Sequence, residues 1–337
     1  MRIFLYEFIT GGGMFSVSPP DLPSGSLLRE GSAMFNSVAE DLSRIPNAEV
    51  VGIRDSRLTQ DSIPEIEYQV VTSAEEESRR FDSLAASADW TLVIAPEFDE
   101  ILLHRTRRVE ELGGRLLGPN SSTVALGTYK DRTVAHLKSH GIRTTTGLTF
   151  SVGSPVPDSI SYPAVLKPID GAGSQGMRLI KAKENFPKLF RGTFRLEEFQ
   201  SGIPVSAAVL CGPNLRIGLP ACQQYLSPDG SFAYLGGKVP LEREFGIRAE
   251  RLASRVAESL PDCRGYIGVD IVLGPSVEWD AVIELNPRLT TSYVGLRQLA
   301  NCNLAAAMLE LARGESPELC FHAGTVEFRA DGVVTNA

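Results

Sequence analysis

The sequence predicts an α/β chain, α+β overall, with an N-terminal open sheet followed by two smaller mixed regions. Its 337 residues exceed the length at which one hydrophobic core stops growing, so we expect two or three subdomains. In residues 1–118, short apolar runs alternate with longer segments of mixed polarity, which is typical of an open sheet covered by helices. Farther along, alternating segments flank turns and indicate β-hairpins. We therefore expect three parts, at residues 1–118, 119–195 and 196–330.

Composition excludes several classes of protein. Lys and Arg total 33 against 41 Asp and Glu, a net charge of −8, so we expect no nucleic-acid partner. No window approaches the ~20 apolar residues that span a bilayer, so no membrane partner is expected either. The five cysteines are scattered, odd in number and never spaced as Cys-x-x-Cys. This argues against a disulfide framework or a zinc site and fits a cytoplasmic location.

The first part contains a clear amphipathic helix. Met34, Phe35, Val38 and Leu42 recur at helical spacing and form an apolar stripe that can pack on a sheet. The glycine run at residues 11–13 follows the first strand, at the edge where open α/β sheets bind ligands; a merely flexible loop fits equally well. The expected strands are 3–8, 50–53, 68–71 and 91–95.

The second and third parts mix helices with short strands. Thr128 with Asp131 resembles a capping box and Gly141 supplies a stop, so a helix is expected over 129–140. Leu252, Val256 and Leu260 repeat at helical spacing, and the apolar residues before Gly314 indicate another helix. The remaining expected elements are strands at 162–169, 177–180 and 195–199 and the helix at 303–313.

A glycine-rich loop literally matches G-x-G-x-x-G. The dinucleotide-binding form of that motif opens a helix, whereas residues 177–180 alternate like a strand, so a β-hairpin is expected instead. The backbone N–H groups of such a hairpin can lie over a polyphosphate, because glycine allows close approach. Lys167, just upstream, adds a positive charge; an ordinary glycine turn remains an alternative. The loop residues are Gly171, Gly173, Ser174, Gln175 and Gly176.

A second pattern places acids on one face of a β-ribbon. Alternation in residues 265–273 and 281–286 puts Asp270 on one strand and Glu284 and Asn286 on the next. With a turn centred near residue 277, Asp270 lies opposite Glu284, with Cβ atoms roughly 4.5–5.5 Å apart. Two carboxylates so close need a shared proton or a cation, and an all-oxygen set suits Mg²⁺. Arg288 then follows the second strand; a solvated hairpin face is the alternative.

The order of these features from residue 119 to 313 resembles the ATP-grasp superfamily. The resemblance implies a pre-ATP-grasp domain at 1–118, a central subdomain with a glycine-rich lid at 119–195 and a C-terminal subdomain with the metal site at 196–330. Lys167 and Arg288 are implied to act on the transferred phosphoryl group, with two Mg²⁺ ions held by Asp270, Glu284 and Asn286. The implied ATP-binding residues are Lys130, Lys167, the five loop residues, and the adenine-reading hinge of Glu197, Glu198, Phe199 and Gln200.

Two departures from the superfamily pattern concern charge. Residues 202–206 offer no acid for the ribose, which leaves Glu198 as a substitute candidate. Gly268 stands where many ligases of the superfamily carry an arginine before the first metal ligand.

The resemblance implies a carboxylate-amine ligase that forms an amide, ADP and phosphate from small-molecule substrates. Residues 284–296 and 6–8 resemble the ligases that join tyramine to glutamate in methanofuran-type cofactor synthesis. There, residues 291–293 either face the acceptor or pack at a helix start, and Arg297 either holds a substrate carboxylate or caps a surface. Superfamily members are often homodimers.

Three other functions were weighed against a ligase. A non-catalytic ATP sensor would not need the acids and Arg288 together. A dinucleotide-dependent oxidoreductase would need a helix after Gly176. A protein kinase would need His-Arg-Asp or Asp-Phe-Gly, and neither occurs.

Overall fold

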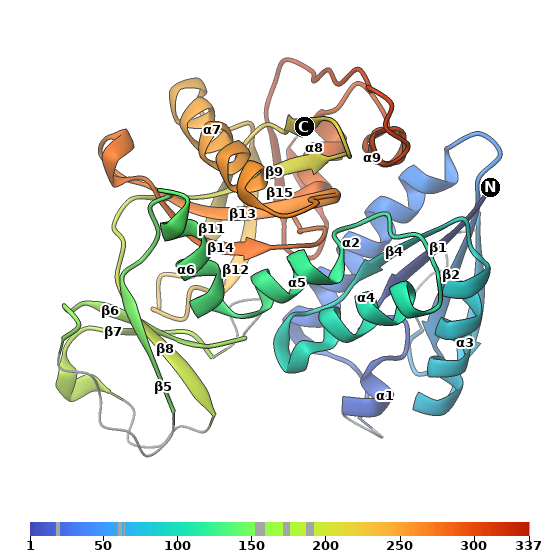
Figure 1. The fold of residues 1–337 in the computed structure, drawn as a ribbon, viewed down its shortest axis with the longest axis horizontal. Coiled ribbons are helices and arrows are strands. Elements are labelled where there is room, and N and C mark those ends of the chain that lie inside the picture. The colour runs from blue at the N-terminus through green and yellow to red at the C-terminus, as the bar shows by residue number, and fades with distance from the viewer. Residues whose placement is uncertain are drawn as a thin grey trace.

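The computed structural model describes residues 1–17, 21–59, 63, 65–151, 159–170, 176–186 and 192–336. These residues form three β-sheets with helices packed on and between them (Figure 1). Among them, no helix has both the length and the apolar character needed to cross a bilayer.

The N-terminal part is an open parallel sheet with helices on both faces. Its elements are β1 (Arg2–Glu7), α1 (Met14–Val17), α2 (Gly25–Ser43), β2 (Glu49–Asp55), β3 (Ile66–Val71), α3 (Ala74–Ser87), β4 (Trp90–Ile94), η1 (Phe98–Glu100) and α4 (Ile101–Glu111). The strands lie in the order β3-β2-β1-β4, and all pairs are parallel. Ile3 and Leu5 pack on the α2 side, whereas Phe4 and Tyr6 pack on the α3 and α4 side. The predicted stripe of α2 is buried, which confirms that helix.

Two short helices, α5 (Ser121–Thr128) and α6 (Lys130–Ser139), follow this sheet. The prediction of one helix over 129–140 holds for α6, and Gly141 follows it at φ +66°. The predicted capping box is wrong: the hydroxyl of Thr128 donates back to the carbonyl four residues earlier, and no side chain caps α6. Asn120 caps the preceding helix instead, accepting a hydrogen bond from the N–H of Thr123 at 3.0 Å.

A small antiparallel sheet lies beside α6 (Figure 1). Its strands are β5 (Gly147–Ser151), β6 (Ala164–Pro168), β7 (Arg178–Ile180) and β8 (Thr193–Glu198), with η2 (Lys183–Asn185) after β7. They lie in the order β5-β8-β6-β7. The strand β7 pairs with β6, as a hairpin around the glycine-rich loop predicts. The domain border expected at residue 195 falls inside β8, and the three-part division stays a prediction.

The C-terminal part is a larger sheet that carries helices on both faces. Its elements are β9 (Ile203–Cys211), β10 (Arg216–Gly218), β11 (Cys222–Leu226), β12 (Tyr234–Val239), α7 (Arg243–Ser259), β13 (Gly265–Leu273), η3 (Val277–Trp279), β14 (Ala281–Asn286), α8 (Tyr293–Leu299), α9 (Leu304–Ala312), β15 (Val326–Arg329) and β16 (Val334–Asn336). The order is β14-β13-β9-β11-β12-β15-β16, with β10 on β9. Alternation along β9 sends Val205, Ala207 and Val209 toward α7, and Ala208 and Leu210 toward α9.

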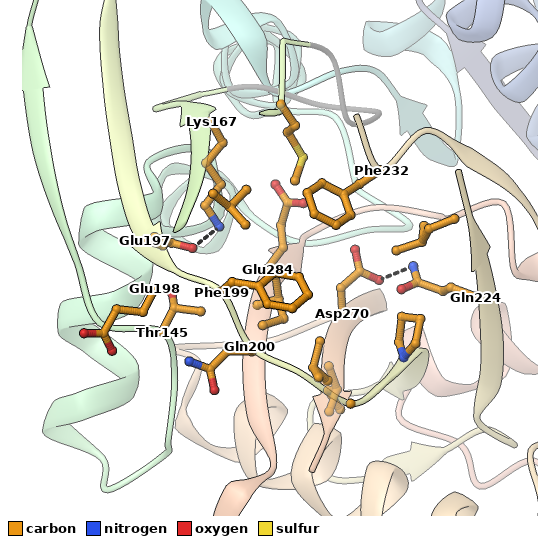
Figure 2. A pocket seen from close by; sticks show the side chains of 18 residues that line it. Thr145, Lys167, Glu197, Glu198, Phe199, Gln200, Gln224, Phe232, Asp270 and Glu284 are labelled. Carbon is orange, nitrogen blue, oxygen red and sulfur yellow. Dashed lines mark hydrogen bonds and ion pairs between the residues drawn. The ribbon is translucent and has the colours of Figure 1, made fainter. Parts of the chain in front are cut away.

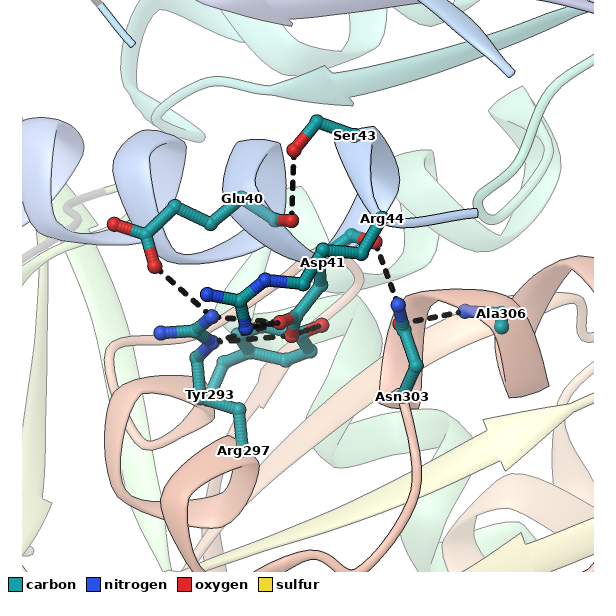
Figure 3. A network of polar contacts seen from close by, with 8 residues as sticks. All are labelled: Glu40, Asp41, Ser43, Arg44, Tyr293, Arg297, Asn303 and Ala306. Atoms are coloured by element: carbon teal, nitrogen blue, oxygen red, sulfur yellow. Dashed lines mark hydrogen bonds and ion pairs between the residues drawn. The ribbon is translucent and has the colours of Figure 1, made fainter. Parts of the chain in front are cut away.

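Helix α2 joins the first sheet to the C-terminal part. Its apolar stripe belongs to the same buried cluster as α8 and α9. Near its end, the carboxylate of Asp41 accepts hydrogen bonds from the Tyr293 hydroxyl at 2.7 Å and from the Arg297 guanidinium at 2.7–3.1 Å (Figure 3). Tyr293 and Arg297 therefore fix this contact, and neither lines the cavities beside Asp270. For Tyr293 the helix-start alternative is the one the structure supports.

Candidate active site

A pocket opens between the small sheet and the larger one (Figure 2). Its volume is about 190 Å³. Strands β6 and β8 supply one wall, and β11, β13 and β14 supply the other. The predicted residues that line it are Lys167, Glu197, Glu198, Phe199, Gln200, Asp270 and Glu284. We call this the inter-sheet pocket.

The predicted ribbon register is confirmed. Strands β13 and β14 are antiparallel, Asp270 pairs with Glu284, and Gly268 pairs with Asn286. The Asn286 amide donates to Asp270 Oδ2 at 3.1 Å, and the amide of Gln224 on β11 donates to Asp270 Oδ1 at 3.0 Å. The ribbon therefore brings two carboxylates and an amide together, and the two carboxylates line the pocket.

The two acids differ in their proton affinity. Burial, together with the charge of Glu284, raises the pKa of Asp270 to about 7. Burial acts in the same direction on Glu284, but the charges of Lys130 and Lys167 hold its pKa below the usual value. Such a difference is expected when two acids share one site without a cation between them.

The donor set fits Mg²⁺. It consists of hard oxygen atoms from two acids and one amide, which leaves further positions for water and phosphate oxygens. Within the described ranges there is no cluster of three His, Cys, Asp or Glu side chains that could hold a metal. The proposed metal ligands are therefore Asp270, Glu284 and the Asn286 amide oxygen. Metal binding by these three residues stays a prediction.

Both predicted lysines are buried and paired. Lys130 Nζ lies 2.8 Å from Glu284 Oε1 and therefore reaches the ribbon from α6. Lys167 Nζ lies 2.5 Å from Glu197 Oε2, while Arg195 Nε donates to the other oxygen of Glu197 at 2.6 Å. These two cations keep the pKa of Glu197 below its usual value despite its burial. Lys130 and Lys167 therefore place two positive charges near Glu284.

The predicted hinge lies at the end of β8. The N–H of Glu198 donates to Thr146 O and that of Phe199 to Pro163 O, at 2.9 and 3.0 Å. These two N–H groups are therefore occupied and cannot donate hydrogen bonds to an adenine base. The Phe199 ring lies nearly parallel to that of Phe232 across the pocket mouth, with centroids 6.2 Å apart. These rings offer an apolar surface for a planar group.

Most of the predicted glycine-rich lid lies outside the described residues. This applies to Gly171, Gly173, Ser174 and Gln175. The last loop glycine, Gly176, has a φ of +71°, in the left-handed region that favours glycine.

Arg288 lies in a second cavity of about 90 Å³, which we call the arginine cavity. Asp270 and Glu284 line both this cavity and the inter-sheet pocket, so the two spaces meet at the acids. Arg288 Nε and Nη2 donate to the two oxygens of Glu97 at 2.8 and 3.0 Å. Glu97 follows β4, so the N-terminal sheet contributes to the site. Thr291 and Ser292 line the arginine cavity, as one of the two expectations for them required.

Sequence reasoning missed Glu97, which pairs with Arg288, and several polar residues that line these cavities. Glu97 had a usable signal, because it follows a buried strand at the edge where open α/β sheets bind ligands. Gln224, Glu30 and Tyr234 carry no motif and reach the site only through tertiary packing.

Known proteins match this chain along most of its length. An ATP-grasp domain model matches residues 130–292, and a pre ATP-grasp 3 domain model matches 48–124. Tyramine--L-glutamate ligase of Methanocaldococcus fervens is 26% identical over 90% of this chain and 93% of its own. The Methanocaldococcus jannaschii enzyme of that name is 25% identical over 91% and 89%.

A solved structure shows the same fold. N5-carboxyaminoimidazole ribonucleotide synthetase, solved as an ADP complex, superposes with a TM-score of 0.71 and 15% identity over 97% of this chain and 80% of its own. Together with the two domain models and the matches along nine tenths of the chain, this confirms the predicted fold class. The chain belongs to the ATP-grasp superfamily of ATP-dependent ligases.

Proposed function

We propose that the protein is an ATP- and Mg²⁺-dependent carboxylate-amine ligase that forms an amide through an acyl phosphate. The observation that carries this proposal is the position of Asp270 and Glu284. They line both the inter-sheet pocket and the arginine cavity, so a nucleotide in one space would meet a substrate in the other at these acids.

In the first step, a substrate carboxylate oxygen attacks the γ-phosphorus of ATP, and the bond to the leaving ADP oxygen breaks. Lys130 and Lys167 would lie against the phosphates, and Arg288 would stabilise the charge that develops on the moving group. Oxygen atoms of Asp270, Glu284 and Asn286 would hold one or two Mg²⁺ ions, whose positive charge would offset the negative charge of the phosphates. No side-chain nucleophile is required, because positioning and electrostatics supply the acceleration.

In the second step, the amine nitrogen attacks the acyl carbon, and inorganic phosphate leaves with the electron pair of the C–O bond. The ammonium group of the amine gives up one proton before the attack and a second as the amide forms, both to solvent or to the released phosphate, and the amide nitrogen keeps the third. The enclosed cavity would exclude water, which otherwise hydrolyses the acyl phosphate.

Glutamate and tyramine are the substrates we propose to test first. Two relatives that match along most of the chain carry the name tyramine--L-glutamate ligase. Their identity of 25–26% supports a carboxylate and an amine of this kind. The place of the reaction would then be the synthesis of a C1-carrier cofactor.

The test is a reconstituted reaction with ATP, Mg²⁺, L-glutamate and tyramine. ADP release and a condensed product in the mass spectrum are expected only when all four are present. Omitting one component at a time provides the controls. ATP binding without ADP release or product across a broad panel of acids and amines would contradict the ligase and favour a non-catalytic ATP sensor.

A further inference from the structure

Two cavities meet at Glu30 and Arg288, where helix α2 faces the ribbon. The arginine cavity lies toward the acids. A narrower space of about 30 Å³, which we call the apolar cavity because most of its lining is apolar, lies toward the N-terminal sheet. Ile9, Leu27 and Met34 line it, as does Glu7, whose carboxylate accepts hydrogen bonds from the N–H groups of Ile9 and Thr10.

The Glu30 carboxylate faces this junction without a partner. It has no hydrogen bond or ion pair with any residue that the structure describes. Burial raises its pKa to about 7, while the charges of Arg288 and Arg29 act against that shift. Arg288 is already engaged with both oxygens of Glu97, so it does not neutralise Glu30 by direct contact.

A second unpartnered group lines the same cavity. The hydroxyl oxygen of Tyr234 is buried and makes no hydrogen bond within the described part of the chain. Burial raises the pKa of Tyr234 well above its usual value, and the charge of Glu30 contributes to the shift, which places the two side chains near one another. A buried hydroxyl without a partner is costly, so a ligand atom is expected beside it.

The charges around the junction favour a cation. Glu97 offsets Arg288, whereas Glu30 has no offsetting partner among the described residues. An ammonium group has three N–H donors, which can reach a carboxylate and a hydroxyl oxygen together.

We propose that Glu30 binds the ammonium group of the amine acceptor, with the Tyr234 hydroxyl as its second partner. This assignment rests on the proposed ligase function and names the element that recognises its acceptor.

The first test compares charge with shape. Glu30→Gln keeps the side-chain length but removes the charge, so the KM for tyramine is expected to rise about 10- to 100-fold at saturating ATP, Mg²⁺ and L-glutamate. Tyr234→Phe is expected to raise it about 3- to 10-fold. Glu40→Gln removes the same charge from the same helix outside the cavity, where the Glu40 carboxylate pairs with Arg297 at 3.0 Å, and should leave KM unchanged.

Hydroxylamine separates recognition of a cation from formation of the acyl phosphate. It is uncharged at mildly alkaline pH and captures acyl phosphates as hydroxamates, so Glu30→Gln should form hydroxamate at the wild-type rate. An unchanged KM for tyramine, or equal losses with tyramine and hydroxylamine, would overturn the proposal. A rise in the KM for glutamate that disappears with glutarate would overturn it too, because Glu30 would then bind the amino group of the acid.

Failure of the ligase function has a different signature, since the wild-type protein would then form neither amide nor hydroxamate. Calorimetric titration of tyramine in the presence of ADP and Mg²⁺ tests the ammonium site even in that case. Weaker binding to Glu30→Gln than to wild type supports the site. Equal affinity, or no binding to wild type, overturns it.

Discussion

Two acids on helix α2 meet the C-terminal part of the chain in opposite ways. Glu30 and Asp41 are eleven residues apart, close to three full turns, so they lie on one face roughly 16 Å apart along the axis. The Asp41 carboxylate accepts hydrogen bonds from the Tyr293 hydroxyl and the Arg297 guanidinium. Glu30 faces a cavity and has no partner among the described residues. The same helix therefore carries a contact that holds two parts together and a contact that is left for a ligand.

The largest effect on turnover is expected at Asp270 and Glu284, the two acids of the ribbon that line the same cavity as Glu30. Asp270→Asn or Glu284→Gln should lower turnover by about 100- to 1,000-fold, because the phosphates lose a charged ligand for their cation. The free energy of unfolding should not fall in Asp270→Asn, because that change removes one of two neighbouring acids. It should fall in Glu284→Gln, because buried Lys130 loses its charged partner. Steady-state ADP release and urea unfolding measure the two properties. Wild-type turnover at saturating ATP and Mg²⁺ in either variant would contradict the metal assignment.

On the paired side, Asp41→Ala should act on stability. It leaves the Arg297 guanidinium and the Tyr293 hydroxyl without their acceptor in a contact where the Arg297 and Asp41 side chains are only 10% and 8% exposed. We expect a loss of about 3 kcal/mol in the free energy of unfolding. At temperatures where the Asp41→Ala variant remains folded, its KM for tyramine should equal that of the wild type. Glu40→Gln, which removes a half-exposed partner of the same arginine, should cost less than about 0.5 kcal/mol. Equal losses in the two variants would break the comparison.

The smallest effect concerns the pH dependence of stability. Glu30 has a pKa of about 7 in the folded protein and an ordinary value of 4.5 in the unfolded chain. Between these two pH values the folded protein keeps a proton on Glu30 that the unfolded chain has released. The resulting stability is present at low pH and is lost as pH rises through about 7. Glu30→Gln should therefore lose less unfolding free energy than wild type between about pH 5 and pH 8, by on the order of 2 kcal/mol.

Paired urea titrations of wild type and Glu30→Gln at the two pH values isolate this effect, because Asp270, with its own pKa of about 7, contributes equally to both proteins. Parallel pH profiles for the two proteins would show that Glu30 is not held in a desolvated cavity.

The ribbon was predictable from sequence because its determinants are local. Alternation in the two strands and the turn near residue 277 set the register, so the pairing of Asp270 with Glu284 follows without knowledge of the rest of the fold. The start of α6 was not predictable by the same means. Thr128 has two competing partners in sequence, and its hydroxyl takes the backbone of the preceding helix.

The remaining parts of the candidate site depend on distant segments. Glu30, Glu97 and Tyr234 come from three separate elements, and their convergence is set by how α2 and β4 pack against the large sheet. No spacing within one segment encodes that arrangement. The roles of the lysines, the hinge and the lid glycines remain predictions, as does the homodimer.

The pairing of Glu97 with Arg288 has a consequence for chimeric enzymes. The arginine that would face the moving phosphoryl group is oriented by an acid from the first sheet, 191 positions earlier in the chain. Exchanging N-terminal regions between relatives would therefore alter the catalytic centre as well as the proposed amine-binding site. The catalytic centre would be kept only if the new region brings a carboxylate to the position of Glu97. Truncation to a minimal nucleotide-binding core would release that guanidinium and leave an impaired catalyst.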